Sequence, residues 1–194
     1  QTLCEFAHTL AAAKDKATLE LLDRAIVLLV ASANPDGVDH VAEWYGRTKG
    51  KPWEGTEMPW LYHPYVGHDN NRDWFMLTQA ESRILAKILY EEWCPVVAVD
   101  LHQMGSRGAR FFISPFTDPI NPNIHPVINQ QQLLIGGHVV TDLTMAGKGG
   151  AVHTSIFDNW WHGDLSAGAH RHNITGILTE SASARLASPI FLRK

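Results

Sequence analysis

Short apolar runs that alternate with segments of helical periodicity constrain the fold of this chain more than any other feature. The runs lie at residues 26–30, 95–101, 111–114 and 174–179. Runs of this length are typical of strands buried on both faces of a sheet. Segments with helical spacing of apolar residues lie at 2–14, 73–93 and 122–145. This alternation predicts an α/β sandwich around a largely parallel sheet.

Length, charge and hydropathy favour one domain and exclude some partners. The chain has 194 residues, of which 45% are hydrophobic and 19% charged, and its net charge is −4. No run of like charges suggests nucleic acid or an anionic membrane surface as a partner. The longest apolar stretch, 25–33, is far below the roughly 20 residues that span a bilayer. Cys4 and Cys94 lack metal-type spacing, so we expect buried thiols, with a single disulfide as the alternative.

Reactive side chains follow the ends of the predicted strands. Asp100 and His102 close the second run, and Glu180 follows the fourth. A long loop at 46–67, rich in Gly, Pro, Trp and Tyr, leads toward Asn71 and Arg72. In open α/β sheets ligands bind beyond the carboxyl ends of the strands. We therefore expect these side chains to form one site.

Each of these residues also has a purely structural interpretation. His102 could be a core histidine bonded to a carbonyl, but Asp100 on the same strand face is placed to orient a metal-bound imidazole. Glu180 could face solvent, but a carboxyl at the end of an apolar strand is desolvated and suited to proton transfer. Asn71 and Arg72 could be a helix cap and a surface charge, but an arginine fork also clamps carboxylates in two-point fashion.

Taken together, the motifs resemble those of the zinc carboxypeptidase family. They occur in the order Asn34-Pro35-Asp36-Gly37, Asn71-Arg72, Asp100-Leu101-His102 and Glu180. The long form of the second motif, residues 62–74, is similar to a bacterial-type branch of the family. The resemblance implies a three-layer sandwich with a mixed, largely parallel central sheet. It also implies a zinc-dependent hydrolase, an exopeptidase acting on peptides with a free C-terminal carboxylate, and an exported bacterial protein.

The same resemblance implies a role for each site residue. His102 matches a zinc ligand, and Glu180 matches the general base that activates the metal-bound water. Asn71 and Arg72 match the pair that grips the terminal carboxylate of the substrate. Arg47 matches the arginine that polarises the scissile carbonyl. Zinc lowers the pKa of bound water to about 7, and a cationic group stabilises the oxyanion.

Two departures from the family pattern qualify these roles. The family takes its first two zinc ligands from a His-x-x-Glu motif that precedes the first helix visible here. We therefore expect residues 1–194 to be a single, partial catalytic domain that lacks this segment. The His-x-x-Glu from His40 to Glu43 follows the Asn-Pro-Asp-Gly turn instead, and it is the alternative ligand pair. The substrate-contacting tyrosine of the family is missing from 157–163, where Trp161 or His162 could replace it.

Two other functions stay open at this point. One is a zinc amidase of the same fold that acts on a cell-wall or conjugated amino-acid substrate. The other is a peptide-binding domain that kept the carboxylate clamp but lost the metal. Residues 163–168 do not fit the spacing of a nucleophile elbow, and residues 147–150 do not fit a phosphate loop. A serine hydrolase or nucleotide enzyme is therefore disfavoured. His170 and His172 could bind a metal adventitiously, although a solvated pair is the simpler interpretation.

Overall fold

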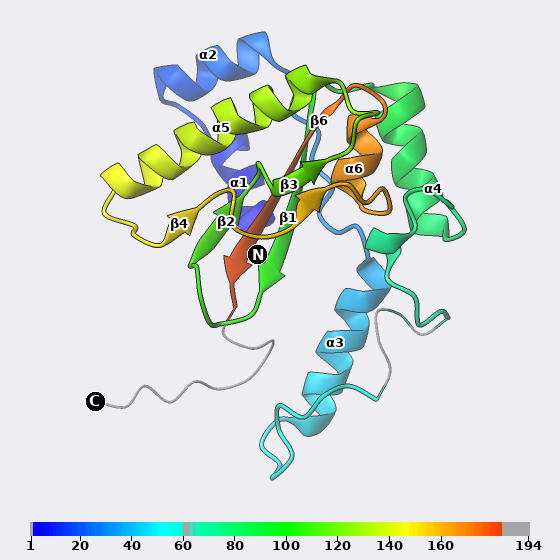
Figure 1. The fold of residues 1–194 in the computed structure, drawn as a ribbon. Helices are drawn as coiled ribbons and strands as arrows, with labels where there is room; N and C mark the ends of the chain where they lie inside the picture. Colours follow the sequence, from blue (N-terminus) through cyan, green and yellow to red (C-terminus); the bar gives the residue numbers. More distant parts are fainter. Residues whose placement is uncertain (1, 60–62, 64, 184–194) are drawn as a thin grey trace.

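The computed structural model describes residues 2–59, 63 and 65–183. The fold is α/β, with a central sheet of four strands in the order β1-β6-β2-β4 (Figure 1). The strands of this sheet are β1 (Val97–Met104), β2 (Phe111–Ile113), β4 (Ala151–Val152) and β6 (Thr175–Ala182). A separate two-stranded sheet pairs β3 (Thr117–Ile120) with β5 (Asp158–Asn159).

The central sheet is mixed and mostly parallel, as the sequence predicts. β1 runs parallel to β6 with His102 opposite Glu180. β2 runs antiparallel to β6 with Phe112 opposite the same glutamate, and β4 runs parallel to β2. Strand β6 therefore has a bonded neighbour on each edge at the level of Glu180.

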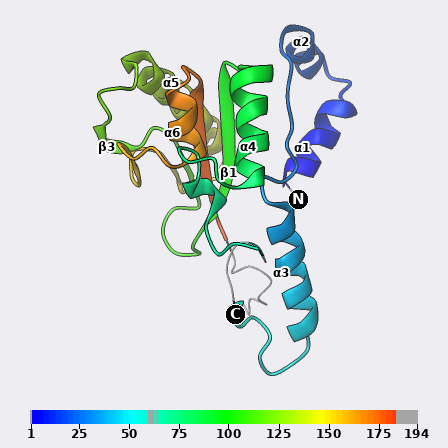
Figure 2. The ribbon, with the colours of Figure 1, turned by 90° about the vertical axis from the view of Figure 1, so that its right-hand side faces the viewer.

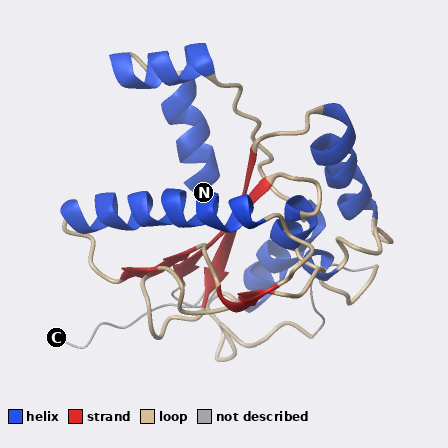
Figure 3. Cartoon of the chain, turned by 45° about the horizontal axis from the view of Figure 1, so that its top comes forward, coloured by secondary structure: helices blue, strands red, loops and turns tan. Residues whose placement is uncertain are grey.

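Helices lie on both sides of this sheet. Figure 2 shows α5 (Pro126–Met145) and α6 (Leu165–His170) on one side, with α1 (Thr2–Ala11) and α2 (Lys16–Arg24) on the other. The long helix α5 runs across the strands (Figure 3). Beside β1 lies α4 (Ala80–Lys87), which continues into the π-helical turn η2 (Ile88–Glu92). No helix in the described ranges is both long and apolar enough to cross a membrane.

Helix α3 (Pro35–Thr48) projects away from the sheet (Figures 1 and 2). It begins at the Asn-Pro-Asp-Gly motif because the side chain of Asn34 accepts a hydrogen bond from the Gly37 N–H at 2.9 Å. Pro35 occupies the first helical turn, where its missing N–H leaves no helical bond unmade. This motif therefore caps a helix as well as turning the chain.

Among the described residues, two small hydrophobic clusters lie next to β6. One joins Ala98 of β1 to Ala169 of α6 and Ile174, and the other joins Phe112, Phe116 and Leu178. Because alternate residues of a strand face the same side, the contact of Ala98 with α6 shows which side Asp100 and His102 face. These side chains project toward α6.

The first predicted strand, residues 26–30, is not a strand in the structure. The segment belongs to neither sheet, and its side chains are 37% to 78% exposed. An apolar run becomes a buried strand only when a neighbouring strand bonds to its backbone, and no described strand does so here. β1 is accordingly an edge strand, and Val97, Val99 and Leu101 are exposed on it.

Smaller corrections concern the thiols and the helix bounds. Cys4 and Cys94 are free but exposed, so the expectation of buried thiols is wrong. The helix predicted from residue 73 begins at Ala80, because the carboxylate of Asp73 accepts hydrogen bonds from the N–H groups of Thr78 and Gln79. These bonds hold a turn ahead of the helix.

Candidate functional site

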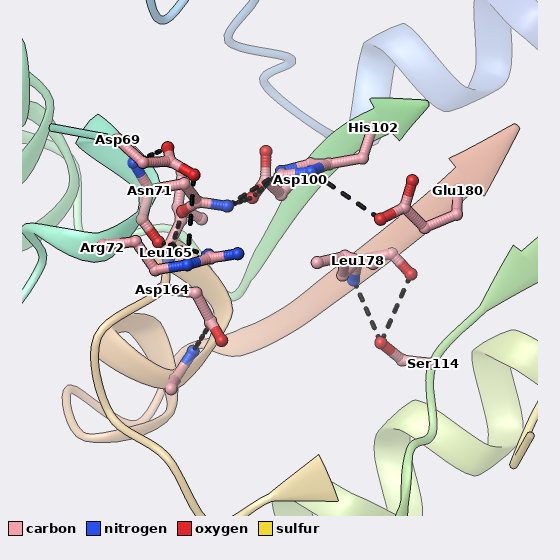
Figure 4. A network of polar contacts seen from close by, with 11 residues as sticks. Asp69, Asn71, Arg72, Asp100, His102, Ser114, Asp164, Leu165, Leu178 and Glu180 are labelled. Carbon is pink, nitrogen blue, oxygen red and sulfur yellow. Dashed lines mark hydrogen bonds and ion pairs between the residues drawn. The ribbon is translucent and has the colours of Figure 1, made fainter. Parts of the chain in front are cut away.

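His102 and Glu180 stand next to each other on neighbouring parallel strands. Nδ1 of His102 lies 3.9 Å from Oε1 of Glu180 (Figure 4). Both residues lie near the carboxyl ends of their strands and face the side on which α6 packs. The strand register produces this pairing directly, since residues 102 and 180 are partners in the ladder.

Asp100 holds the other edge of the imidazole. Its Oδ2 lies 2.8 Å from Nε2 of His102. A carboxylate accepts a hydrogen bond, so the ring proton lies on Nε2, and Nδ1 presents its lone pair toward Glu180. Burial alone would lower the pKa of His102, but the hydrogen bond and negative charge of Asp100 outweigh it and raise that pKa.

Glu180 is a buried carboxyl with spare hydrogen-bonding capacity. It is 6% exposed, and its Oε2 has no hydrogen-bond partner in the described part of the chain. Burial raises the pKa of Glu180, and its proximity to the imidazole of His102 opposes this rise. A desolvated carboxyl with a raised pKa and an uncommitted oxygen is suited to accept a proton from a reacting group.

Asn71 joins three segments at this point. It belongs to the 3-10 turn η1 (Asn70–Arg72). Its Nδ2 donates to Oδ2 of Asp100 at 3.1 Å and lies 2.9 Å from Nε2 of His102. Its Oδ1 accepts a hydrogen bond from the N–H of Leu165, the first residue of α6, at 2.9 Å. Both ends of this amide are therefore engaged within the protein.

Arg72 lines a cavity of about 270 Å³ together with Asn71, His102 and Glu180. Its side chain is 50% exposed, and its guanidinium lies 5.4 Å from the ring centroid of Trp161. Nη1 donates to the carbonyl oxygen of Asn71, which leaves further N–H groups of the fork for a ligand. The structure thus brings four of the five expected site residues to one cavity.

The exception is Arg47. It lies on the projecting helix α3 and pairs with Glu43 at 2.9 Å, outside the residues that line the cavity. Trp161 does line the cavity, whereas His162 packs edge-on against Phe75. Of the two expected replacements for the family tyrosine, only Trp161 is therefore placed at the site.

Trp161 is seated over Gly163. A Cβ atom at position 163 would lie 2.1 Å from two carbons of the indole ring, which is far inside van der Waals contact. The ring therefore occupies the space that a side chain would need. This glycine defines the position of the aromatic surface beside Arg72.

Asp164 is a cavity residue that the strand-end argument did not identify. Its Oδ1 accepts a hydrogen bond from the Ala167 N–H at 2.7 Å and caps α6. Burial raises the pKa of Asp164, and the negative charge of Asp100 adds to the effect. The signal in the sequence was the aspartate just before a run of small residues, which is an N-cap pattern.

The metal that the resemblance implies finds a partial set of ligands. His102 Nδ1 and the unpaired Oε2 of Glu180 have the donor chemistry of a zinc site and of its base. A catalytic zinc ion takes about three protein ligands, and the described residues contain no group of three His, Cys, Asp or Glu able to hold a metal. His40 and Glu43, the alternative pair, lie on α3, and neither lines this cavity.

Comparison with known proteins gives a family match for nearly half of the sequence, at its N-terminal end. Residues 1–93 match a family described as zinc carboxypeptidase. This region contains the Asn34 to Gly37 motif and the Asn71-Arg72 pair, while His102 and Glu180 lie beyond it. Searches of curated proteins and of solved structures give no match. Residues 1–93 are therefore similar to the zinc carboxypeptidase family, and the mixed α/β sheet is consistent with a carboxypeptidase-like fold.

Proposed function

We propose that this chain is part of a zinc-dependent metallocarboxypeptidase that hydrolyses C-terminal peptide bonds. The observation that carries the proposal is the placement of His102 and Glu180 3.9 Å apart in a cavity that Arg72 also lines. A candidate metal ligand, a base and a carboxylate-binding cation share one space. The adjacent family match, residues 1–93, supports the same assignment.

Glu180 is the proposed general base. Its raised pKa and unpaired Oε2 allow it to take a proton from the attacking water and to pass that proton to the leaving amine. His102 would supply one metal ligand through Nδ1, with Asp100 fixing its tautomer. Bound zinc would contribute polarisation of the scissile carbonyl and of the attacking water.

Arg72 is the proposed reader of the terminal carboxylate. Its fork is half-exposed toward the cavity, and Trp161 supports it from one side. Asn71, expected as the second half of this clamp, would act mainly by joining the turn that carries Arg72 to Asp100 and Leu165. We further propose that residues 1–194 form one domain, and that a His-x-x-Glu segment outside this chain completes the zinc site.

The test is Glu180→Gln in a protein that contains this chain together with the completing segment. Glutamine keeps the shape but takes no proton, so we expect zinc content to stay unchanged and turnover to fall by about a hundred- to ten-thousand-fold. The matched control is Glu91→Gln, because Glu91 is exposed on η2. A Glu180→Gln variant that keeps more than about a tenth of the activity removes this residue from the mechanism.

A further inference from the structure

One wall of the cavity, here called the aromatic wall, is carried by residues 154–162, whose aromatic side chains are partly exposed. Phe157 and Trp161 line the cavity, yet they are 47% and 40% exposed, and Trp160 between them is 52% exposed. Rings left in contact with water contribute only part of their burial energy to holding a segment. Between Thr154 and His162 only Asn159 is buried, at 4% exposure.

The buried side-chain amides of Asn159 and Gln132 form a chain of hydrogen bonds, here called the relay. It ends on β6, the strand that carries Glu180. Nδ2 of Asn159 donates to Oε1 of Gln132 at 3.1 Å. Gln132, in the middle of α5, is fully buried, and its Nε2 donates to the carbonyl oxygen of Gly176 at 2.8 Å. Gly176 lies on β6, the strand that carries Glu180. Two hydrogen bonds thus connect the aromatic wall to β6 through one side chain.

The geometry around the relay depends on close packing. A Cβ atom at Gly176 would lie 2.6 Å from the carbonyl oxygen of Ser166, so glycine lets α6 lie directly against β6 at this point. A buried amide that loses its hydrogen-bond partners is costly, so the orientation of Gln132 is well defined. Its carbonyl end points to the wall, and its amino end points to the sheet.

The pairing of β3 with β5 holds the same segment from the other side. The Asn121 N–H donates to the carbonyl oxygen of Asn159 at 3.1 Å, and Asn121 Nδ2 donates to that of Trp160 at 3.0 Å. These bonds fix the wall to β3, which lies outside the central sheet. Phe157 also packs edge-on against Phe112 of β2. Among the hydrogen bonds of the described residues, those through Gln132 connect the wall to β6.

We propose that Asn159 and Gln132 are positioning residues that set the distance between the aromatic wall and the strand bearing Glu180. They do not touch the cavity themselves, so they act through Phe157 and Trp161. The proposal rests on the proposed function only in that a peptide is the ligand of this cavity. The relay itself is a property of the fold.

The test compares Asn159→Ala and Gln132→Met with Asn129→Ala. Asn129 lies on α5, as Gln132 does, and accepts a hydrogen bond from Asn159 at 3.4 Å. It has no hydrogen bond to β6 among the described residues, so it is the control for a bond that does not reach that strand. Hydrogen–deuterium exchange is followed in residues 154–162 and, separately, in α5 and β6. Loss of one amide bond is expected to speed exchange of 154–162 about fivefold, with α5 and β6 unchanged in Asn159→Ala.

Peptide kinetics on the active protein form the second arm. A misplaced wall should raise KM about fivefold while kcat changes less than about twofold, since Glu180 and His102 stay in place. Asn129→Ala removes only the longer hydrogen bond of Asn159, so it should change exchange and KM by less than about twofold. Unchanged exchange in Asn159→Ala, equal acceleration in all segments, or a fall in kcat with KM constant would each overturn the proposal.

The two arms separate this proposal from the proposed function. Hydrogen–deuterium exchange can be measured on an inactive protein. It therefore shows whether the relay holds residues 154–162 even if the protein hydrolyses no peptide. If Gln132→Met fails to fold, Asn159→Ala decides alone, because it removes the side chain at the edge of the relay rather than in the middle of α5.

Discussion

Ile177 and Leu178 on β6 are 1% and 5% exposed, whereas every side chain of residues 26–30 is at least 37% exposed. Both segments are short apolar runs, and the sequence pattern predicts a buried strand for each. β6 lies between β1 and β2, while residues 26–30 belong to neither sheet. Burial of an apolar run is therefore decided by the strands available to pair with it, which local composition does not specify.

The largest expected difference between the two regions is in stability. Ile177→Ala should lower the free energy of unfolding by about 2–5 kcal/mol, because it leaves a cavity in a closed core. Leu28→Ala should cost less than about 1 kcal/mol, because that leucine is already 38% exposed. Urea denaturation of both variants measures the two values. Equal losses would break the comparison and show that residues 26–30 are buried in solution.

A second prediction concerns how the stability of the fold changes at acidic pH. His170 is 2% exposed in α6, and burial lowers its pKa from 6.5 to about 4. Between these values the unfolded chain binds the proton that the folded chain excludes. The contribution of His170 to stability is therefore complete above about pH 6.5 and falls by about 3 kcal/mol as the pH drops to about 4.

His170→Gln removes this titration. The variant should lose less stability than wild type between pH 7 and pH 4, whatever its stability at neutral pH. Denaturation at several pH values gives the two slopes. Parallel slopes would mean that His170 is solvated in the folded protein, against its position between Gln132 and Gly176.

The smallest of the three effects separates the two arginines of the predicted site. Arg72 lines the cavity and Arg47 lies on α3, so only Arg72→Ala should impair recognition of a free carboxylate. Charged hydrogen bonds are worth about 1.5–3 kcal/mol, or roughly ten- to 150-fold in kcat/KM. C-terminally amidated peptides should be poor substrates of the wild type, and their kcat/KM should fall little in Arg72→Ala.

Arg47→Ala is the matched control and should leave the preference for free acid over amide unchanged. Equal losses for both peptides in Arg72→Ala would show that Arg72 supports the fold rather than reading the carboxylate. Loss of the preference in Arg47→Ala would show that α3 reaches the site in the working protein.

The predictable part of the site follows from strand geometry. His102 and Glu180 could be placed together because residues at the carboxyl ends of adjacent parallel strands share one edge of the sheet. The engagement of Asn71 by Leu165 could not be predicted, since these residues are 94 positions apart and meet through loop packing. Arg47 was assigned by family order alone, and the Asn-Pro-Asp-Gly motif caps α3 without specifying the direction in which the helix projects.

Gly163 has a consequence for how this cavity can change over generations. The indole of Trp161 fills the place of a side chain at position 163, so the residue tolerated at one of these positions depends on the residue at the other. A mutation that gives residue 163 a side chain displaces the ring, and a smaller residue at 161 opens room that a larger residue at 163 could refill. Substitutions at 161 and 163 should therefore arise in compensating pairs. Glu180 lies on a central strand bonded on both edges, so such pairs could reshape the cavity wall while the strand that carries the carboxyl stays fixed.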